Sequence, residues 1–379
     1  MNALRLLAST VLVLSLVSCG DKALRYYNQG LDAMDSADVE GAIESFERSI
    51  ELRPDDPDAH VNLGVAYHTM GRYKEALAQF RIAQEYYHDD PVLRFNIAET
   101  YSAMGAYQAA SREYELALRL DGEFYQALVG YGKLHLDTGD LEAAEENLVH
   151  ALTVKPSYNP TYIYLGLLYA RTEKFHQATY YLYRALKNDT SADEARLGLA
   201  YVFYKRRLYE EAIGEYEQVY VHDEQNTQAV LGLGLSYLAL GHTKQAETMF
   251  EKALDMQSVF PEAYKGLGDV YFLNKRYVAA MANYRMAVQQ REDFPEAYTS
   301  MGKLFLSTGR LNEAREAFDE ALYRSPDDPW VLYHLGLLYI ELKDRGQAEA
   351  YLQKSLENAP SDGELRELVQ ESLRSIDQP

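Results

Sequence analysis

The sequence predicts an all-α protein in which ten helical hairpins stack side by side as an α-solenoid. Three observations support this expectation. Small and apolar residues recur at helical spacing within residues 57–90, the same pattern returns every 34 residues, and no linker rich in Gly, Ser or Pro interrupts it. A single helical hairpin cannot bury its apolar face alone, so each copy needs its neighbours.

The pattern is clearest in the copy that begins at Pro57. Leu63, Gly64 and Tyr67 fall on one face of a first expected helix, and Phe80 falls on the facing side of a second. A small residue at the crossing allows two antiparallel helices to approach closely, while the larger side chains fill the space around the contact. The ten expected repeats are residues 23–56, 57–90, 91–124, 125–158, 159–192, 193–226, 227–260, 261–294, 295–328 and 329–362.

This pattern resembles the tetratricopeptide repeat, and the resemblance covers about nine-tenths of the chain. It implies a right-handed α-solenoid whose first helices line a concave wall that binds partner proteins. Beyond the last repeat, residues 363–379 carry a further apolar stripe, which predicts a helix that caps the array. The stripe consists of Leu365, Leu368, Val369, Leu373 and Ile376.

The amino terminus has a different composition. Arg5 precedes a short apolar run that ends at Cys19, and the run is too short to span a bilayer comfortably. Its last four residues, Leu-Val-Ser-Cys, resemble the lipobox of bacterial lipoprotein precursors. The resemblance implies that residues 1–18 are removed as a signal peptide and that Cys19 carries acyl chains such as palmitate. Residues 19–22 then form a short linker; an ordinary signal peptide with a coincidental cysteine is the alternative.

The residue after Cys19 indicates which membrane holds the protein, and the net charge indicates which partners it binds. In enteric bacteria an aspartate directly after the lipidated cysteine resembles an inner-membrane signal; Gly20 stands there, which favours the outer membrane. With 37 basic and 58 acidic residues, the net charge of −21 argues against a nucleic-acid partner. We therefore expect a periplasm-facing protein of a bacterial cell envelope.

No motif points to catalysis. The nine histidines form no metal-binding pair, and the one cysteine has no second thiol beside it. The Gly-Leu-Gly segments that begin at Gly232 and Gly266 lie within expected helices without a preceding strand, so close helix packing explains them better than a nucleotide site. We expect no catalytic residue, no metal, no cofactor and no small-molecule substrate.

Two features of the expected wall are candidate binding sites. Asn28, Asn62 and Asn96 occupy the same position of the first three repeats, and their amides both donate and accept hydrogen bonds. They resemble the asparagine ladder in the repeat arm of O-linked N-acetylglucosamine transferases, which implies contact with a partner's backbone. The alternative is three polar residues at a tolerant surface position.

The second candidate is a cationic and aromatic patch in the middle of the chain. Tyr and Arg dominate many binding surfaces, and such a patch favours a partner with carboxylates and apolar side chains. Because tyrosine is abundant throughout the chain, packing is the alternative role. The patch consists of Lys133, Tyr164, Arg171, Tyr201, Tyr204 and Lys205. No three consecutive repeats match the two-carboxylate clamp of chaperone co-factors in this family.

These observations predict a membrane-anchored scaffold without enzymatic activity. It would hold extended or helical segments of envelope proteins and assist assembly of an envelope complex. A self-assembling structural protein, and a recruiting arm for a separately encoded glycosyltransferase, are the alternatives.

Overall fold

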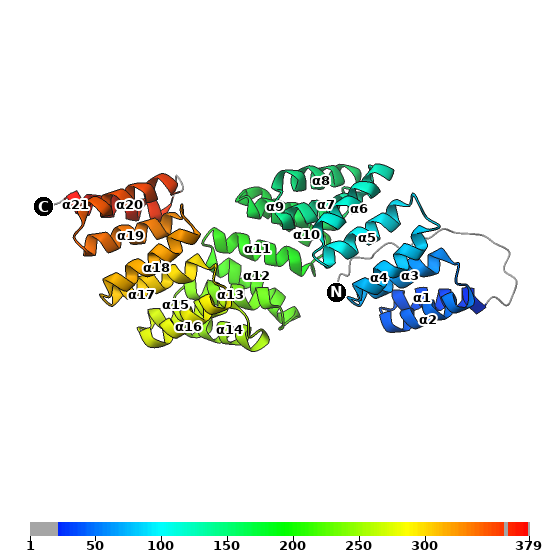
Figure 1. The fold of residues 1–379 in the computed structure, drawn as a ribbon, viewed down its shortest axis with the longest axis horizontal. Helices are drawn as coiled ribbons and strands as arrows, with labels where there is room; N and C mark the ends of the chain where they lie inside the picture. Colours follow the sequence, from blue (N-terminus) through cyan, green and yellow to red (C-terminus); the bar gives the residue numbers. More distant parts are fainter. Residues whose placement is uncertain (1–21, 360–362, 378–379) are drawn as a thin grey trace. The chain divides into compact units, whose positions relative to one another are not determined.

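The computed structural model describes residues 22–359 and 363–377, and within them it contains twenty-one α-helices and no strand. The expected all-α repeat fold is confirmed. The chain divides into two compact units, Met1–Gly198 and Leu199–Pro379, which we call unit 1 and unit 2. Each repeat contributes one odd-numbered and one even-numbered helix (Figure 1).

The helices of unit 1 are α1 (Lys22–Asp35), α2 (Val39–Leu52), α3 (Pro57–Thr69), α4 (Tyr73–Gln84), α5 (Pro91–Ala103), α6 (Tyr107–Leu120), α7 (Tyr125–Thr138), α8 (Leu141–Val154), α9 (Asn159–Arg171) and α10 (Phe175–Asn188). Helix α11 (Asp193–Lys205) spans the division between the units. Those of unit 2 are α12 (Tyr209–His222), α13 (Thr227–Ala239), α14 (Thr243–Met256), α15 (Pro261–Leu273), α16 (Tyr277–Gln290), α17 (Pro295–Ser307), α18 (Leu311–Arg324), α19 (Pro329–Glu341), α20 (Arg345–Asn358) and α21 (Glu364–Asp377).

Local sequence signals set where the first helices begin. Asp56, Asp90 and Asp328 each cap a helix, because their carboxylates accept backbone N–H groups of the first turn. A proline follows each of these aspartates at the first helical position, where its missing N–H costs nothing. The repeat edges are therefore fixed by short-range chemistry.

Close helix crossing accounts for the small residue at the eighth position of each repeat. A Cβ atom on Gly64 would lie 2.5 Å from the Phe80 ring, which is too close for any side chain. Phe80 itself is fully buried, as is Ala76 on the same helix. The pairing of a small residue with a large ring thus holds the two helices of a repeat together.

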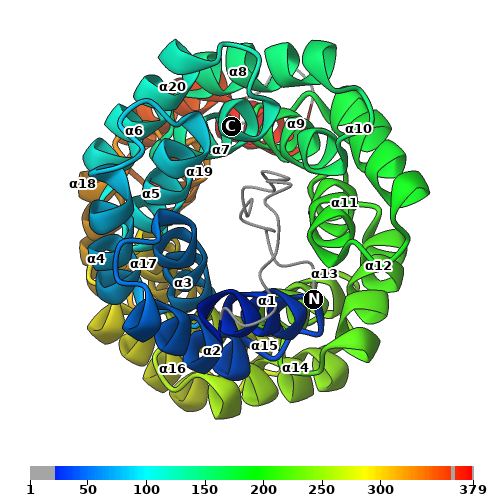
Figure 2. The same cartoon turned by 90° about the vertical axis from the view of Figure 1, so that its right-hand side faces the viewer.

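Within each unit the odd-numbered helices form an inner layer and the even-numbered helices an outer layer (Figure 2). In unit 1, helices α1, α3, α5 and α7 each contact the next odd-numbered helix in line. In unit 2, α13, α15, α17 and α19 do the same, up to α21. No such contacts join successive even-numbered helices within the described part of the chain. Each unit therefore curves with its first helices on the concave side, which we call the first-helix wall.

The carboxyl-terminal helix α21 packs on α19 and α20. Leu365 and Val369 of α21 are buried against Leu352 and Tyr333. The expected signal segment, Cys19 and most of the expected linker lie outside the described residues. Among the helices that are described, none combines the length and the apolar character needed to cross a bilayer.

Candidate functional site

The three asparagines of the expected ladder occupy different environments. Asn28 is exposed on α1. Asn62 is buried, and its Nδ2 donates to the Tyr27 hydroxyl and to the Asp58 carbonyl, each at 2.9 Å. Asn96 is fully buried, and its amide has no hydrogen-bond partner among the described residues. Only Asn28 therefore presents its amide at the surface in this conformation.

The residues of the expected cationic and aromatic patch are divided between the two units. In unit 1 the Lys133 ammonium lies 5.6 Å from the centre of the buried Tyr164 ring, and Arg171 donates to the Leu136 carbonyl. In unit 2 Tyr201 is exposed and Tyr204 contacts the ring of Tyr209. Lys205 is also exposed, at the end of α11.

Lys133 lies within a cluster of carboxyl and tyrosyl groups on the first-helix wall of unit 1. We define cluster 1 as Glu99, Tyr114, Lys133, Tyr164 and Glu194. Burial raises the pKa of Glu99, whereas the hydrogen bond from Tyr114 and the charge of Lys133 oppose that shift. Burial also raises the pKa of Glu194, again opposed by Lys133 and by the Tyr164 hydroxyl, which donates to Glu194 at 3.5 Å. Lys133 therefore acts electrostatically on two carboxylates.

A second cluster lies on the first-helix wall of unit 2. We define cluster 2 as Lys265, Asp269, Tyr284, Ser300 and Lys303. The Asp269 carboxylate accepts from the Lys265 ammonium at 2.7 Å, from the Tyr284 hydroxyl at 2.8 Å and from the Ser300 hydroxyl at 3.1 Å. Tyr204 belongs to the same surroundings, because the charges of Lys265 and Asp269 both act on its pKa.

Lys303 differs from the other lysine of cluster 2. It forms no ion pair within the described residues, although its side chain is exposed to solvent. Surrounding protein atoms lower its pKa by desolvation, Asp269 opposes that shift, and Lys265 adds to it. The Lys303 side chain thus lies where protein surrounds it but solvent still reaches it, as on a concave wall.

Aromatic side chains of α19 continue the wall beyond Lys303. Burial and the charge of Lys303 lower the pKa of His334 to about 3, so its imidazole is neutral at pH 7. The ring stacks on Phe318 with centroids 5.8 Å apart. Trp330, the one tryptophan of the chain, is 39% exposed and lies 6.4 Å from the His334 ring, which makes it a local reporter.

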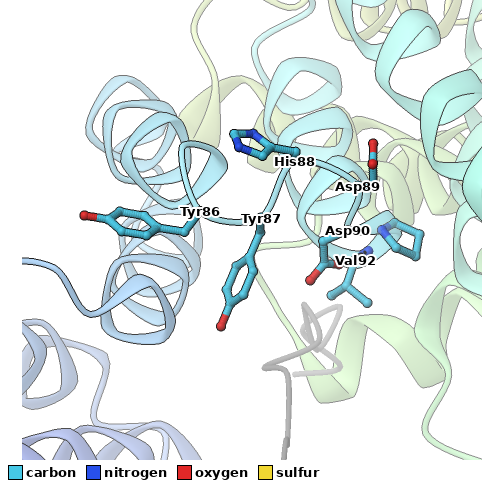
Figure 3. Close-up of a pocket in the computed structure, with 7 residues that line it drawn as sticks. Tyr86, Tyr87, His88, Asp89, Asp90 and Val92 are labelled. Atoms are coloured by element: carbon cyan, nitrogen blue, oxygen red, sulfur yellow. Dashed lines mark hydrogen bonds between the residues drawn. The ribbon is translucent and has the colours of Figure 1, made fainter.

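A shallow depression lies between α4 and α5 (Figure 3). Polar side chains around it form hydrogen bonds that hold the fold together. Its lining comprises Tyr86, Tyr87, His88, Asp89, Asp90, Pro91 and Val92. Tyr87 donates to Asp58 at 2.7 Å, and Asp90 caps α5. No group of acidic, histidine or cysteine side chains suited to a metal ion occurs in residues 22–359 and 363–377.

Sequence reasoning missed Glu99, Asp269 and Lys303. All three occupy the ninth position of their repeats, as Lys133 does. The other six repeats all carry an apolar or aromatic residue there. An acidic residue followed one repeat later by a lysine, once in each unit, was the signal that could have revealed them. The ninth-position residues in chain order are Leu31, Val65, Glu99, Lys133, Leu167, Tyr201, Leu235, Asp269, Lys303 and Leu337.

Comparison with known proteins shows the family to which the chain belongs. Models of the tetratricopeptide repeat match residues 27–91, 95–151, 165–229 and 231–295, and further matches cover 271–328 and 305–371. The chain therefore belongs to the tetratricopeptide repeat family, a family of protein-interaction scaffolds. An uncharacterized protein of Methanocaldococcus jannaschii is 44% identical over 55 residues, which are 14% of this chain and 64% of that protein.

Solved structures share the fold. A tetratricopeptide repeat protein from Parabacteroides merdae has a TM-score of 0.57 and 19% identity, over 67% of this chain and 99% of that one. Yeast Tom70 has a TM-score of 0.51 and 14% identity, over 94% and 95%. A chain of the APC/C hetero-tetramer Cut9-Hcn1 also has a TM-score of 0.51, with 15% identity over 93% and 96%. At these identities the likeness concerns the fold alone.

Proposed function

We propose that this chain is a lipid-anchored scaffold of a bacterial envelope that holds segments of partner proteins against its first-helix wall. Partner binding is supported by the placement of charged side chains on that wall, in cluster 1 and cluster 2, where helix packing alone favours apolar residues. The anchor rests on the resemblance of the segment that ends at Cys19 to a lipobox. Lys303 in particular has no ion pair among the described residues. Membership of a family of protein-interaction scaffolds agrees with this function.

Photo-crosslinking in cells tests partner binding. A photoreactive amino acid at Tyr204 or at Trp330 reports on the wall, and one at Val278 is the control, because Val278 is 88% exposed on the outer helix α16. We expect discrete adducts with another protein from the two wall positions and none from Val278. Adducts with copies of this chain alone would favour a self-assembling protein, and equal labelling from all three positions would contradict the scaffold.

Lipid anchoring is tested separately through Cys19. Because it is the one cysteine of the chain, Cys19→Ala removes every thiol without disturbing a disulfide. We expect wild-type protein in bacteria to incorporate an alkyne-labelled fatty acid and to sediment with the outer membrane, and the variant to do neither. Incorporation of the label by the variant, or an unlabelled wild type, would contradict the anchor without affecting the partner-binding wall.

A further inference from the structure

The two polar clusters occupy matching places in the repeat array. Three residues of cluster 2 follow residues of cluster 1 by 170 positions, or five repeats: Lys303 corresponds to Lys133, Asp269 to Glu99 and Tyr284 to Tyr114. The surrounding sequence supports this alignment. Gly-Lys-Leu begins at both Gly132 and Gly302, and Leu-Gly-Leu-Leu-Tyr begins at both Leu165 and Leu335. The two lysines can therefore be compared neighbour by neighbour.

In unit 1 the protein itself supplies the carboxylates around the lysine. The Lys133 ammonium lies 5.6 Å from the centre of the Tyr164 ring. Its charge acts on Glu99 of α5 and on Glu194 of α11, so two carboxyl groups lie near one ammonium group. Glu194, from α11, also accepts the hydrogen bond of Tyr164. Cluster 1 thus supplies the counter-charges of Lys133 itself. We call the buried Glu99 its inner carboxylate and the exposed Glu194 its outer carboxylate.

In unit 2 the corresponding outer carboxylate is engaged elsewhere. Glu364 of α21 corresponds to Glu194, and its Oε2 accepts from the Arg207 guanidinium at 2.6 Å. The inner carboxylate, Asp269, already accepts three hydrogen bonds, including the one from Lys265. Lys133 therefore has Glu194 as its outer carboxylate. The corresponding carboxylate in unit 2, Glu364, is paired with Arg207 instead of Lys303.

We propose that a side-chain carboxylate of a partner protein occupies, beside Lys303, the place that Glu194 takes beside Lys133 in unit 1. This inference rests on the proposed scaffold function and specifies what the wall of unit 2 recognises. Charge complementarity supports it, because Asp269 and Glu296 both act on Lys265, whereas Asp269 is the one carboxylate among the described residues that acts on Lys303. Next to it, Trp330 and His334 provide an aromatic surface for an apolar residue adjacent to the carboxylate. The site needs one carboxylate and thus differs from the two-carboxylate clamp.

Blocked peptides give a direct test with the full chain. The probes are two peptide libraries, acetylated and amidated at their ends, with a central glutamate or a central glutamine between apolar residues. Fluorescence of Trp330 reports binding, since the chain has no other tryptophan. We expect the glutamate library to bind roughly tenfold more tightly than the glutamine library, as a charge-assisted hydrogen bond requires.

Variants assign that preference to Lys303. Lys303→Gln should bind the two libraries equally, and Lys303→Arg should keep the preference for glutamate, because it keeps the positive charge. Lys244→Gln is the matched control, since Lys244 is exposed on the outer helix α14. Circular dichroism should show that all three variants retain the wild-type helix content.

Each outcome decides the proposal. Equal binding of both libraries by the wild type, absence of binding, or a glutamate preference that survives in Lys303→Gln would overturn the carboxylate site. Competition by inorganic phosphate, without any glutamate preference, would assign the site to a different anion. If crosslinks from Trp330 persist unchanged in Lys303→Gln, the scaffold function stands and this inference alone fails.

Discussion

Clusters 1 and 2 place an acidic side chain at the same repeat position, yet they accommodate it in different ways. In unit 1 the acid is Glu99, and position 130 opposite it is glycine. A Cβ atom on Gly130 would lie 2.5 Å from the Glu99 Oε1 and 2.8 Å from the Tyr114 hydroxyl. In unit 2 the acid is the shorter Asp269, and Ser300 stands opposite and donates to it at 3.1 Å.

The difference shows that a buried acid on this wall depends on the residue facing it in the next repeat. Glutamate fills the space that a side chain at position 130 would need, whereas aspartate is one methylene shorter and leaves room for a hydroxyl. Cluster 1 therefore satisfies its acid with Tyr114, and cluster 2 uses Tyr284, Ser300 and Lys265. Charged groups buried in a repeat interface remain stable only when such partners are present.

The largest expected effect comes from mixing the two arrangements. Gly130→Ser places a side chain against a buried, hydrogen-bonded Glu99, so we expect a loss of about 2 to 3 kcal/mol in the free energy of unfolding. The double variant Glu99→Asp with Gly130→Ser reproduces the aspartate and serine pair of unit 2 and should recover most of that loss. Urea unfolding followed by circular dichroism measures both.

A glycine in open surroundings serves as the control for this exchange. Gly214 lies within α12 with no atom near its missing Cβ, so Gly214→Ser should leave stability unchanged within about 0.5 kcal/mol. If the double variant were no more stable than Gly130→Ser alone, the two residues would not be coupled. The explanation for glycine at position 130 would then be wrong.

Removing the tyrosyl hydroxyl should affect the two clusters unequally. Tyr114→Phe removes the hydrogen bond that Glu99 accepts within the described residues, and we expect a loss of about 2 kcal/mol. Tyr284→Phe leaves Asp269 bonded to Lys265 and Ser300, so the expected loss is about 1 kcal/mol. The same urea measurement compares the two variants, and equal losses would show that the additional partners of Asp269 contribute nothing.

The sequence predicted the fold well because every repeat carries the same local signals. The small residue at Gly64, the ring of Phe80 and the capping aspartate before Pro57 act within one repeat, and the structure confirms the helices they predict. The amino-terminal prediction concerns Cys19, which lies outside the described residues, and it remains a prediction. Periodic short-range chemistry is what made the fold accessible.

The wall was harder to predict because its chemistry arises between repeats. Asn62 looked like a surface amide, but Tyr27 of the preceding repeat lies against it and the side chain is buried. Lys133 looked cationic in isolation, and the carboxylates of Glu99 and Glu194 become its neighbours only when helices from different repeats come together. Reading one position down all ten repeats gives part of this information, and the packing of side chains gives the rest.

The smallest expected effect concerns the sixth position, where unit 2 has His334 and unit 1 has Tyr164. The pKa of His334 is lowered to about 3 from the ordinary value of 6.5, so between these values the unfolded chain binds a proton that the folded chain does not. The neutral His334 imidazole therefore makes its full contribution to the free energy of unfolding above pH 6.5, and this contribution is lost as the pH falls toward 3.

His334→Tyr introduces the unit 1 residue and removes this titration. Relative to that variant, the wild type should lose about 1 kcal/mol of its free energy of unfolding between pH 7 and pH 5. The effect is smaller than full burial would give, because solvent partly reaches the ring. Urea unfolding monitored by Trp330 fluorescence detects the change, since Trp330 lies on the same helix, α19. The remaining histidines titrate alike in both proteins and cancel in the difference. Identical pH dependence would mean that His334 is protonated freely in the folded state, so Lys303 and burial would not control its charge.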